Sequence, residues 1–198
     1  MEGLTRTLVG EGILRSQLVM STFLKVDRRE FCHASEISLA YSDMPLGIGY
    51  NATISAPHMH AYALEAALPV LQQTSGDVRV LDVGSGSGFL TVCFARLIQA
   101  LQPSTAFKVI GIEHIEGLAQ LGEQNSRKSH ADLLSSGCVK FMHGDGRSGY
   151  VQEAPYDVIH VGAAASTVPQ SVSFTCACFY ILVAGATEEW WYHDHTRG

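Results

Sequence analysis

The hydrophobic positions along the chain form two kinds of segment, short continuous runs and longer stretches at helical spacing. The run Val78–Val83 is β-branched and apolar except for two charged residues, and it predicts a buried strand. Apolar residues at intervals of three and four positions follow in Phe89–Leu101 and predict a helix. Between the two lies a turn that contains Gly84, Gly86 and Gly88. A strand, a glycine turn and a helix in this order are typical of a nucleotide or nucleoside site.

The same pattern predicts the other elements. Residues 1–30 predict helices with short apolar faces, and residues 32–51 predict an irregular loop because proline and glycine interrupt them. Ser55 lies near the predicted N-cap of a helix that carries Pro57 in its first turn. The remaining predictions are helices at 55–73 and 115–128, and strands at 107–113, 138–143 and 156–162.

Strands that alternate with helices predict a Rossmann-like α/β fold, with a doubly wound, mainly parallel sheet and helices on both faces. In such sheets ligands bind beyond the carboxyl ends of the strands. Glu113 and Asp145 both lie at the carboxyl ends of predicted strands. We therefore expect both carboxylates to lie beside the glycine turn, where three strand ends meet at one crevice.

Length and charge restrict the classes of protein further. The 198 residues fit one domain, with N-terminal helices and a loop in 1–50, a core in 51–170 and a divergent tail in 171–198. The net charge of -6 argues against a nucleic-acid binder. No apolar run is long enough to span a bilayer, and the 5 cysteines, an odd number, favour reduced thiols over a disulfide framework. We expect a cytoplasmic monomer that binds neither nucleic acid nor membrane.

Metal and hydrolase chemistry are disfavoured by spacing. His58 and His60 are two positions apart, which points them in opposing directions on a helix, so no metal site is predicted. Cys176 and Cys178 lack the C-x-x-C spacing of a zinc site. A serine hydrolase needs serine at the centre of the strand-to-helix turn, where this chain has Gly86.

Several motifs in this chain resemble those of a known family. The segment VLDVGSGSG, the acidic end of VIGIE and the turn GDG together resemble class I S-adenosylmethionine-dependent methyltransferases. The segments NATISAPHMH, LLSSGCVKF and APYDVIHVGAAA are more specific. With them, residues 41–170 resemble the protein-L-isoaspartate (D-aspartate) O-methyltransferase family.

The resemblance implies a protein repair enzyme. Such an enzyme moves a methyl group from S-adenosyl-L-methionine to the free carboxylate of L-isoaspartyl and D-aspartyl residues in damaged proteins, which are its expected partners. It implies a catalytic role for Ser55, and places the amino-acid part of the cofactor at the glycine turn, its ribose at Glu113 and its adenine at Asp145. The positions that match cofactor contacts are Ala52, Thr53, Ile54, Ser55, His60, Asp82, Gly84, Ser85, Gly86, Glu113, Asp145 and Gly146.

This methyl transfer requires few catalytic side chains. A substrate carboxylate with a pKa near ~4 is ionised at neutral pH, so no general base is needed. Attack of an anion on a sulfonium cation annihilates charge, so a site that excludes water and aligns the two groups suffices. We expect the Ser55 hydroxyl to orient the carboxylate through a hydrogen bond. The other interpretation of Ser55 is a helix N-cap, which contributes about 1 kcal/mol of stability and no chemistry.

After Gln170 the chain departs from the family pattern. Residues 179–183 predict one strand, but the family's last strands have no counterpart, so the C-terminal strands are truncated or altered. A divergent isoform or a shifted reading frame fits equally well. Two alternatives stay open: a cofactor-binding but catalytically impaired family member that acts through protein binding, and a methyltransferase for a small-molecule acid. A nicotinamide enzyme is disfavoured because its G-x-G-x-x-G fingerprint, counted from Gly84 and Gly86, would place the third glycine at Phe89.

Overall fold

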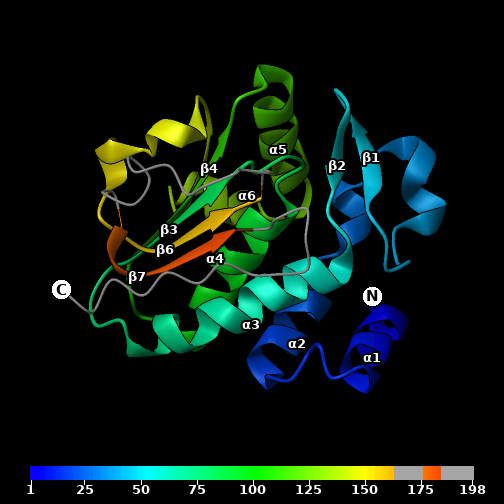
Figure 1. Cartoon of the computed structure of the whole chain (residues 1–198), viewed down its shortest axis with the longest axis horizontal. Coiled ribbons are helices and arrows are strands. Elements are labelled where there is room, and N and C mark those ends of the chain that lie inside the picture. Colours follow the sequence, from blue (N-terminus) through cyan, green and yellow to red (C-terminus); the bar gives the residue numbers. More distant parts are fainter. Residues whose placement is uncertain (163–175, 184–198) are drawn as a thin grey trace.

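The computed structural model describes residues 1–162 and the backbone of residues 176–183. Its centre is a five-stranded sheet in the order β5-β4-β3-β6-β7, in which every neighbouring pair is parallel (Figure 1). Strand order runs outward from β3 in both directions, so the topological switch point lies between β3 and β6. The strands are β3 (Val78–Val83), β4 (Phe107–Glu113), β5 (Val139–His143), β6 (Tyr156–Val161) and β7 (Cys176–Val183).

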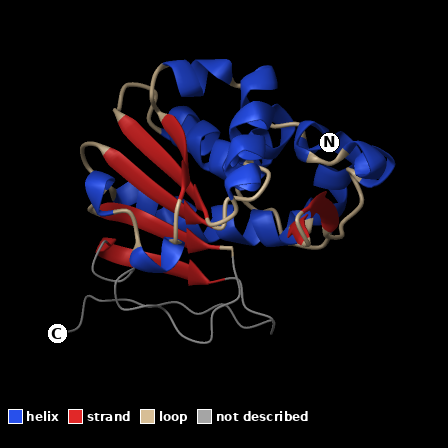
Figure 2. Ribbon diagram, turned by 90° about the horizontal axis from the view of Figure 1, so that it is seen from above, coloured by secondary structure: helices blue, strands red, loops and turns tan. Residues whose placement is uncertain are grey.

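The α-helices lie mainly on one face of this sheet. Figure 2 shows the sheet from above, with most of the helical ribbon to one side of it. Helix and strand residues share one core there, which includes Val80, Val109, Val158, Leu64, Phe94 and Leu118. The helices are α1 (Glu2–Gly10), α2 (Gln17–Lys25), α3 (Pro57–Gln73), α4 (Phe89–Leu101), α5 (Glu116–Ser129) and α6 (Ala131–Ser135).

The opposite face of the sheet carries a second, smaller apolar cluster. Leu81, Ile110 and Ile159 are fully buried in it, and Tyr150 and Ala154 pack against them. These two residues flank a 3-10 turn, η4 (Val151–Glu153), that follows η3 (Gly146–Ser148). Two further 3-10 turns, η1 (Arg28–Phe31) and η2 (Ala34–Leu39), belong to the N-terminal part of the chain.

The turn between β3 and α4 depends on a glycine. Gly88 has φ +89° and occupies the N-cap of α4. A Cβ at this position would lie 2.9 Å from Phe141 Cζ and 3.0 Å from the carbonyl oxygen of Gly122. Both the left-handed backbone and the close approach of α5 and β5 therefore require glycine here.

The predicted Rossmann-like α/β fold with its parallel sheet is confirmed, and the predicted strands and long helices lie within a few residues of the observed ones. Of the helices expected on both faces of the sheet, the described α-helices lie mainly on one face, and η4 lies on the other. The irregular loop expected at 32–51 was wrong in part. It contains η2 and begins an antiparallel hairpin of β1 (Leu46–Gly49) and β2 (Ala52–Ile54). The hairpin turns at Tyr50 and Asn51, which both have positive φ, as a tight hairpin turn requires. Neither turn position holds the glycine that usually signals such a turn.

Other predictions fall outside the described residues or concern membranes. Of the tail predicted at 171–198, the structure describes only the strand at 176–183. This strand includes the residues 179–183 that were predicted to form a strand. Within the described residues, none of the helices combines the length and apolar character needed to cross a bilayer.

Candidate functional site

The carboxyl ends of four parallel strands, β3, β4, β5 and β6, meet around the glycine turn. Backbone hydrogen bonds join them, from Gly84 N–H to Ile112 O (2.8 Å), from Gly144 N–H to Glu113 O (2.9 Å) and from Gly162 N–H to Val83 O (2.8 Å). The turn after β3 is thus fixed between the ends of β4 and β6. This is the crevice expected from the sequence, at the switch point of the sheet.

A pocket opens at this point between the glycine turn, the end of β6 and the start of α3. The predicted site residues that line it are Thr53, Ile54, Ser55, His60, Asp82, Gly84, Ser85 and Gly86. Residues that were not predicted also line it, namely Ser87, Phe89, Leu90, His160 and Gly162. The position of His160 and Gly162 at the end of a predicted strand was a signal that could have identified them.

Ser55 connects the hairpin to α3 and faces this pocket. The helix begins one residue later than a Ser55 cap requires, because Ala56 occupies the N-cap and Pro57 is the first helical residue. The interpretation of Ser55 as an N-cap is therefore wrong. Among residues 1–162 its hydroxyl has no hydrogen-bond partner, so it is available to a ligand.

Two buried polar atoms in the pocket wall have no partner in the described part of the chain. They are Nδ1 of His60 and Oγ of Ser85, in residues that are 6% and 7% exposed. Burial, and secondarily the nearby charge of Arg28, holds the pKa of His60 well below its usual range, so the imidazole is neutral. Unpartnered buried groups are costly, and two in one pocket indicate a polar ligand.

A cation lies behind one wall of the pocket. The Arg28 side chain is fully buried, and its guanidinium carbon is 5.9 Å from the centroid of the Phe89 ring. The same ring packs at 4.9 Å from the ring of His60. Desolvation lowers the pKa of Arg28 to about 10, so it stays charged at neutral pH. This wall therefore favours an anionic group in the pocket.

Asp82 lines the pocket beside His160. It is 1% exposed, and each carboxylate oxygen has a partner. Thr91 Oγ1 donates to Oδ2 at 2.6 Å, and His160 Nδ1 lies 2.8 Å from Oδ1. The predicted cofactor residue Asp82 is thus held by two neighbours, and one of them lines the pocket.

Glu113 lies at the end of β4, next to the glycine turn but outside the pocket lining. It is 4% exposed, and its two carboxylate oxygens accept hydrogen bonds from separate backbone groups. Gly86 N–H donates to Oε2 at 3.1 Å, and Ile115 N–H donates to Oε1 at 3.2 Å. Glu113 therefore anchors the turn in addition to any role toward a ligand.

The other predicted residues lie farther from the pocket. Asp145 is exposed beyond β5, where the side chain of Arg147 binds its carboxylate and lowers the pKa of that carboxyl to about 2. The neighbouring Gly146 is buried against Val83, with no room for a Cβ. Ala52 belongs to β2 and does not line the pocket.

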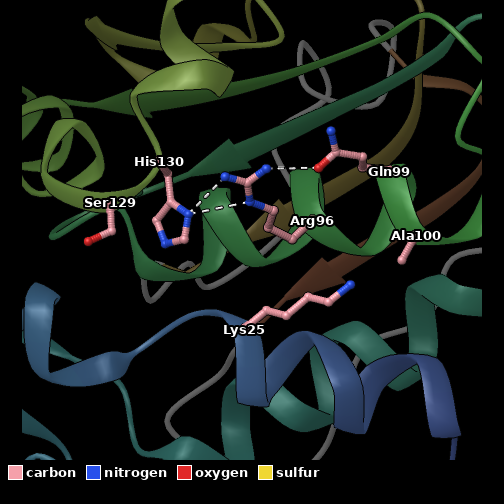
Figure 3. Close-up of a pocket in the computed structure, with 6 residues that line it drawn as sticks. All are labelled: Lys25, Arg96, Gln99, Ala100, Ser129 and His130. Carbon is pink, nitrogen blue, oxygen red and sulfur yellow. Dashed lines mark hydrogen bonds between the residues drawn. The ribbon is translucent and has the colours of Figure 1, made fainter.

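A larger cavity lies elsewhere, between α2, α4 and the end of α5 (Figure 3). Figure 3 shows Arg96 of α4 between His130 and Gln99, with Lys25 of α2 across the cavity. The guanidinium of Arg96 already has protein partners, because it forms an ion pair with Asp132 at 2.7 Å and a hydrogen bond with His130 Nδ1. None of the predicted site residues lines this cavity. We therefore take the pocket beside Ser55 as the candidate site.

A metal centre finds no support in the described residues. Across 1–162 and the described strand after it, no group of three or more His, Cys, Asp or Glu side chains is placed to hold an ion.

Comparison with known proteins identifies the family. Residues 1–174 match the model for protein-L-isoaspartate(D-aspartate) O-methyltransferase. The protein-L-isoaspartate O-methyltransferase of Caenorhabditis elegans is 44% identical over 162 residues, which are 81% of this chain and 66% of that protein. Protein-L-isoaspartate O-methyltransferase 2 of Arabidopsis thaliana is 43% identical over 169 residues, 85% of this chain and 52% of that protein. The chain thus spans between half and two thirds of the length of these two relatives.

A solved structure agrees over most of its length. It is a Plasmodium falciparum protein described as a protein-L-isoaspartate O-methyltransferase in complex with S-adenosyl-L-homocysteine. The two structures have a TM-score of 0.81 at 32% identity, over 94% of this chain and 84% of that chain. On the family match and these relatives, the chain belongs to the protein-L-isoaspartate (D-aspartate) O-methyltransferase family.

Proposed function

We propose that this protein binds S-adenosyl-L-methionine and catalyses transfer of its methyl group to the free carboxylate of L-isoaspartyl and D-aspartyl residues in damaged proteins and peptides. The observation that carries the proposal is the pocket itself. It joins the glycine turn, the unpartnered Ser55 hydroxyl and two orphaned buried polar atoms at the switch point of the sheet. Family membership and the S-adenosyl-L-homocysteine bound to the Plasmodium falciparum relative support it.

The residues present fit the cofactor. Gly84 and Gly86 line the pocket at the end of β3, where we assign the amino-acid part, and His60 Nδ1 and Ser85 Oγ offer hydrogen bonds that the described protein leaves unmade. We assign the ribose hydroxyls to Glu113, which lies at the end of β4 next to the glycine turn. When bound, the sulfonium supplies an activated methyl group for attack by a nucleophile.

The remaining chemistry falls to the chain's own residues. The acceptor carboxylate is ionised at neutral pH, so the site has to hold it and exclude water. Ser55 donates a hydrogen bond to one carboxylate oxygen and leaves the other directed at the methyl group. The buried charge of Arg28 stabilises the anion from behind the Phe89 ring, and the neutral His60 adds no competing charge.

The experiment that tests the function is transfer of labelled methyl groups to an isoaspartyl peptide. The control is the same peptide with a normal aspartyl linkage. Transfer to the isoaspartyl form alone supports the proposal. Binding of S-adenosyl-L-homocysteine without transfer would instead favour the alternative, a cofactor-binding protein that acts through protein partners.

The location and assembly expected from the sequence are also part of the proposal. We propose a monomer in the cytoplasm that binds neither nucleic acid nor membrane. Sedimentation of the purified chain at several concentrations tests the monomer, and a concentration-dependent increase in mass would contradict it.

A further inference from the structure

The cavity between α2, α4 and the end of α5 contains a buried histidine with an unused hydrogen-bond donor. The cavity has a volume of about 410 Å³, which is within the range of small-molecule sites (Figure 3). His130 lines it and is 4% exposed, and its Nε2 has no hydrogen-bond partner among residues 1–162. A buried polar atom without a partner is costly, so this one indicates a ligand.

The contacts of Arg96 determine which nitrogen of the His130 ring carries the proton. A guanidinium can only donate, and Nε and Nη2 of Arg96 lie 3.3 Å and 3.0 Å from Nδ1 of His130. Nδ1 therefore accepts, and in the neutral ring the proton is on Nε2. Burial, and secondarily the charge of Arg96, lowers the pKa of His130 and keeps the ring neutral at physiological pH. Nε2 points away from Arg96, toward the side of the cavity where α2 lies (Figure 3).

Lys25 supplies a positive charge on that side of the cavity. It is the exposed last residue of α2, and within the described part of the chain its ammonium group has no hydrogen bond or ion pair. The described residues that line the cavity include two cations, Lys25 and Arg96, and no acid. Acidic neighbours outside the lining already have partners, since Asp132 binds Arg96 at 2.7 Å and Glu30 Oε1 accepts from Ser129 at 2.6 Å. Lys25 is thus the cation that remains available to a ligand.

We propose that this cavity binds the oxyanion group, a carboxylate or a phosphate, of a small molecule. The N–H at Nε2 of His130 donates to one oxygen, and the Lys25 ammonium group faces another. The site is separate from the pocket beside Ser55, because Arg96 follows Phe89 by seven residues on α4, which is about 10 Å along the helix axis. The inference therefore does not depend on the proposed function.

The test follows the His130 ring by NMR, in protein with isotope-labelled histidine, during titration with inorganic phosphate or with acetate. Binding should shift the Nε2–H signal in a saturable manner, because this proton gains an acceptor. Lys25→Gln removes the charge and should weaken binding about tenfold, the scale of one hydrogen bond between charged groups. His130→Asn keeps an amide oxygen that accepts from Arg96 but removes the donor, and it should weaken binding measured by calorimetry by a similar factor.

The matched control is Arg6→Gln. It removes the same charge from an exposed position on α1 that does not line the cavity. This variant should keep the wild-type affinity and the wild-type shift of the Nε2–H signal. Because Lys25 is exposed, Lys25→Gln provides a folded variant even if His130→Asn does not fold.

The two probes distinguish the sources of the oxyanion. A saturable shift with phosphate alone assigns a phosphate group, one with acetate alone assigns a carboxylate, and a shift with both supports a general oxyanion site. No saturable shift with either probe overturns the proposal. Equal affinity in the wild type and Lys25→Gln overturns it too, as does an equal loss in Arg6→Gln and Lys25→Gln, because binding would then follow overall charge. Methyl transfer to the isoaspartyl peptide affects none of these outcomes.

Discussion

The backbone N–H of Gly86 donates a hydrogen bond to Oε2 of Glu113, with 3.1 Å between nitrogen and oxygen. This bond links the centre of the glycine turn to the end of the neighbouring strand. The second oxygen of the same carboxylate accepts from Ile115 N–H, at the start of α5. One buried side chain therefore holds the turn, the strand end and the next helix in fixed relative positions.

Glu113→Gln tests this anchoring. The amide offers one oxygen where the carboxylate offered two, so one of the two backbone N–H groups would face an NH₂ group. We expect a loss of about 1–3 kcal/mol in the free energy of unfolding, together with weaker binding of S-adenosyl-L-homocysteine. Urea unfolding and calorimetry measure the two effects. Glu116→Gln, at an exposed position in the first turn of α5, is the control and should change neither.

Ser55→Ala separates catalysis from stability. The Ser55 hydroxyl does not cap α3 and bonds to none of residues 1–162, so its removal should leave the melting temperature unchanged. Loss of a hydrogen bond to a charged carboxylate should lower the rate of methyl transfer by about 10-fold or more. Binding of S-adenosyl-L-homocysteine should be retained. Full activity of the variant would show that Ser55 does not orient the substrate.

Thr91→Val should destabilise the protein through Asp82. The substitution keeps the shape of the side chain but removes the donor that lies 2.6 Å from a buried carboxylate oxygen. We expect a loss of about 1–3 kcal/mol on urea unfolding. Thr7→Val replaces an exposed hydroxyl on α1 and should cost less than about 0.5 kcal/mol. Equal effects of the two substitutions would contradict the structural importance of the Asp82 contacts.

His60 should make the protein less stable in mild acid. Its pKa in the folded state is depressed by burial below the unfolded value of 6.5, so the unfolded chain takes up a proton first. Stability from this residue is therefore present above about pH 6.5 and is lost as the pH falls, by up to about 1.4 kcal/mol per pH unit. His130, whose pKa is lowered by burial and Arg96, acts in the same direction.

The measurement is urea unfolding between pH 8 and pH 5, with His60→Gln as the comparison. The variant lacks the buried imidazole, so the difference in stability between it and the wild type should shrink as the pH falls. A constant difference across this range would mean that folding leaves the pKa of His60 unchanged, which would contradict this prediction.

Gly88→Ala compares crowding with backbone strain. Gly88 and Gly137 both have positive φ, but only at Gly88 would a Cβ meet other atoms closer than 4 Å. Gly137→Ala should therefore cost about 1 kcal/mol, the penalty for a left-handed alanine, and Gly88→Ala should cost more because Phe141 has to move. The two midpoints of urea unfolding give the comparison. Equal losses in the free energy of unfolding would show that Phe141 and the neighbouring part of α5 shift at little cost to accommodate the methyl group.

The sequence predicted the parallel sheet well because its strands are continuous apolar runs with a polar residue or glycine at each end. Phe89–Leu101 is a helix with the predicted bounds, since its apolar spacing is regular and Gly88 begins it. The hairpin before α3 was missed for a physical reason. Its turn consists of Tyr50 and Asn51 in left-handed conformations; asparagine tolerates this conformation, but tyrosine does not signal it and no glycine follows.

The candidate site was predictable where a motif coincides with a strand end, as for Glu113 and the glycine turn. Contacts between side chains from different elements were not predictable. Asp82 is predicted to contact the cofactor, and the structure adds two neighbours that its position in the sequence does not indicate, Thr91 and His160, which hold its carboxylate. His160 is 78 positions from Asp82 along the chain, and they become neighbours only because β3 pairs with β6. Periodicity within one element carries no information about such a contact.

The β1–β2 hairpin gives the site two parts with different local stability. An isolated two-stranded hairpin is marginally stable. This hairpin depends for its stability on the burial of Leu46, Ile48 and Ile54 in the main core, and it has no further strand beside it among the described residues. Its amide hydrogens should therefore exchange with solvent through a small local opening, while those of β3 and β4 require global unfolding. Ser55 directly follows this hairpin, and Gly84 directly follows β3. A ligand that contacts both should slow exchange in the hairpin far more than in the sheet, so occupancy of the pocket can be followed without any measurement of turnover.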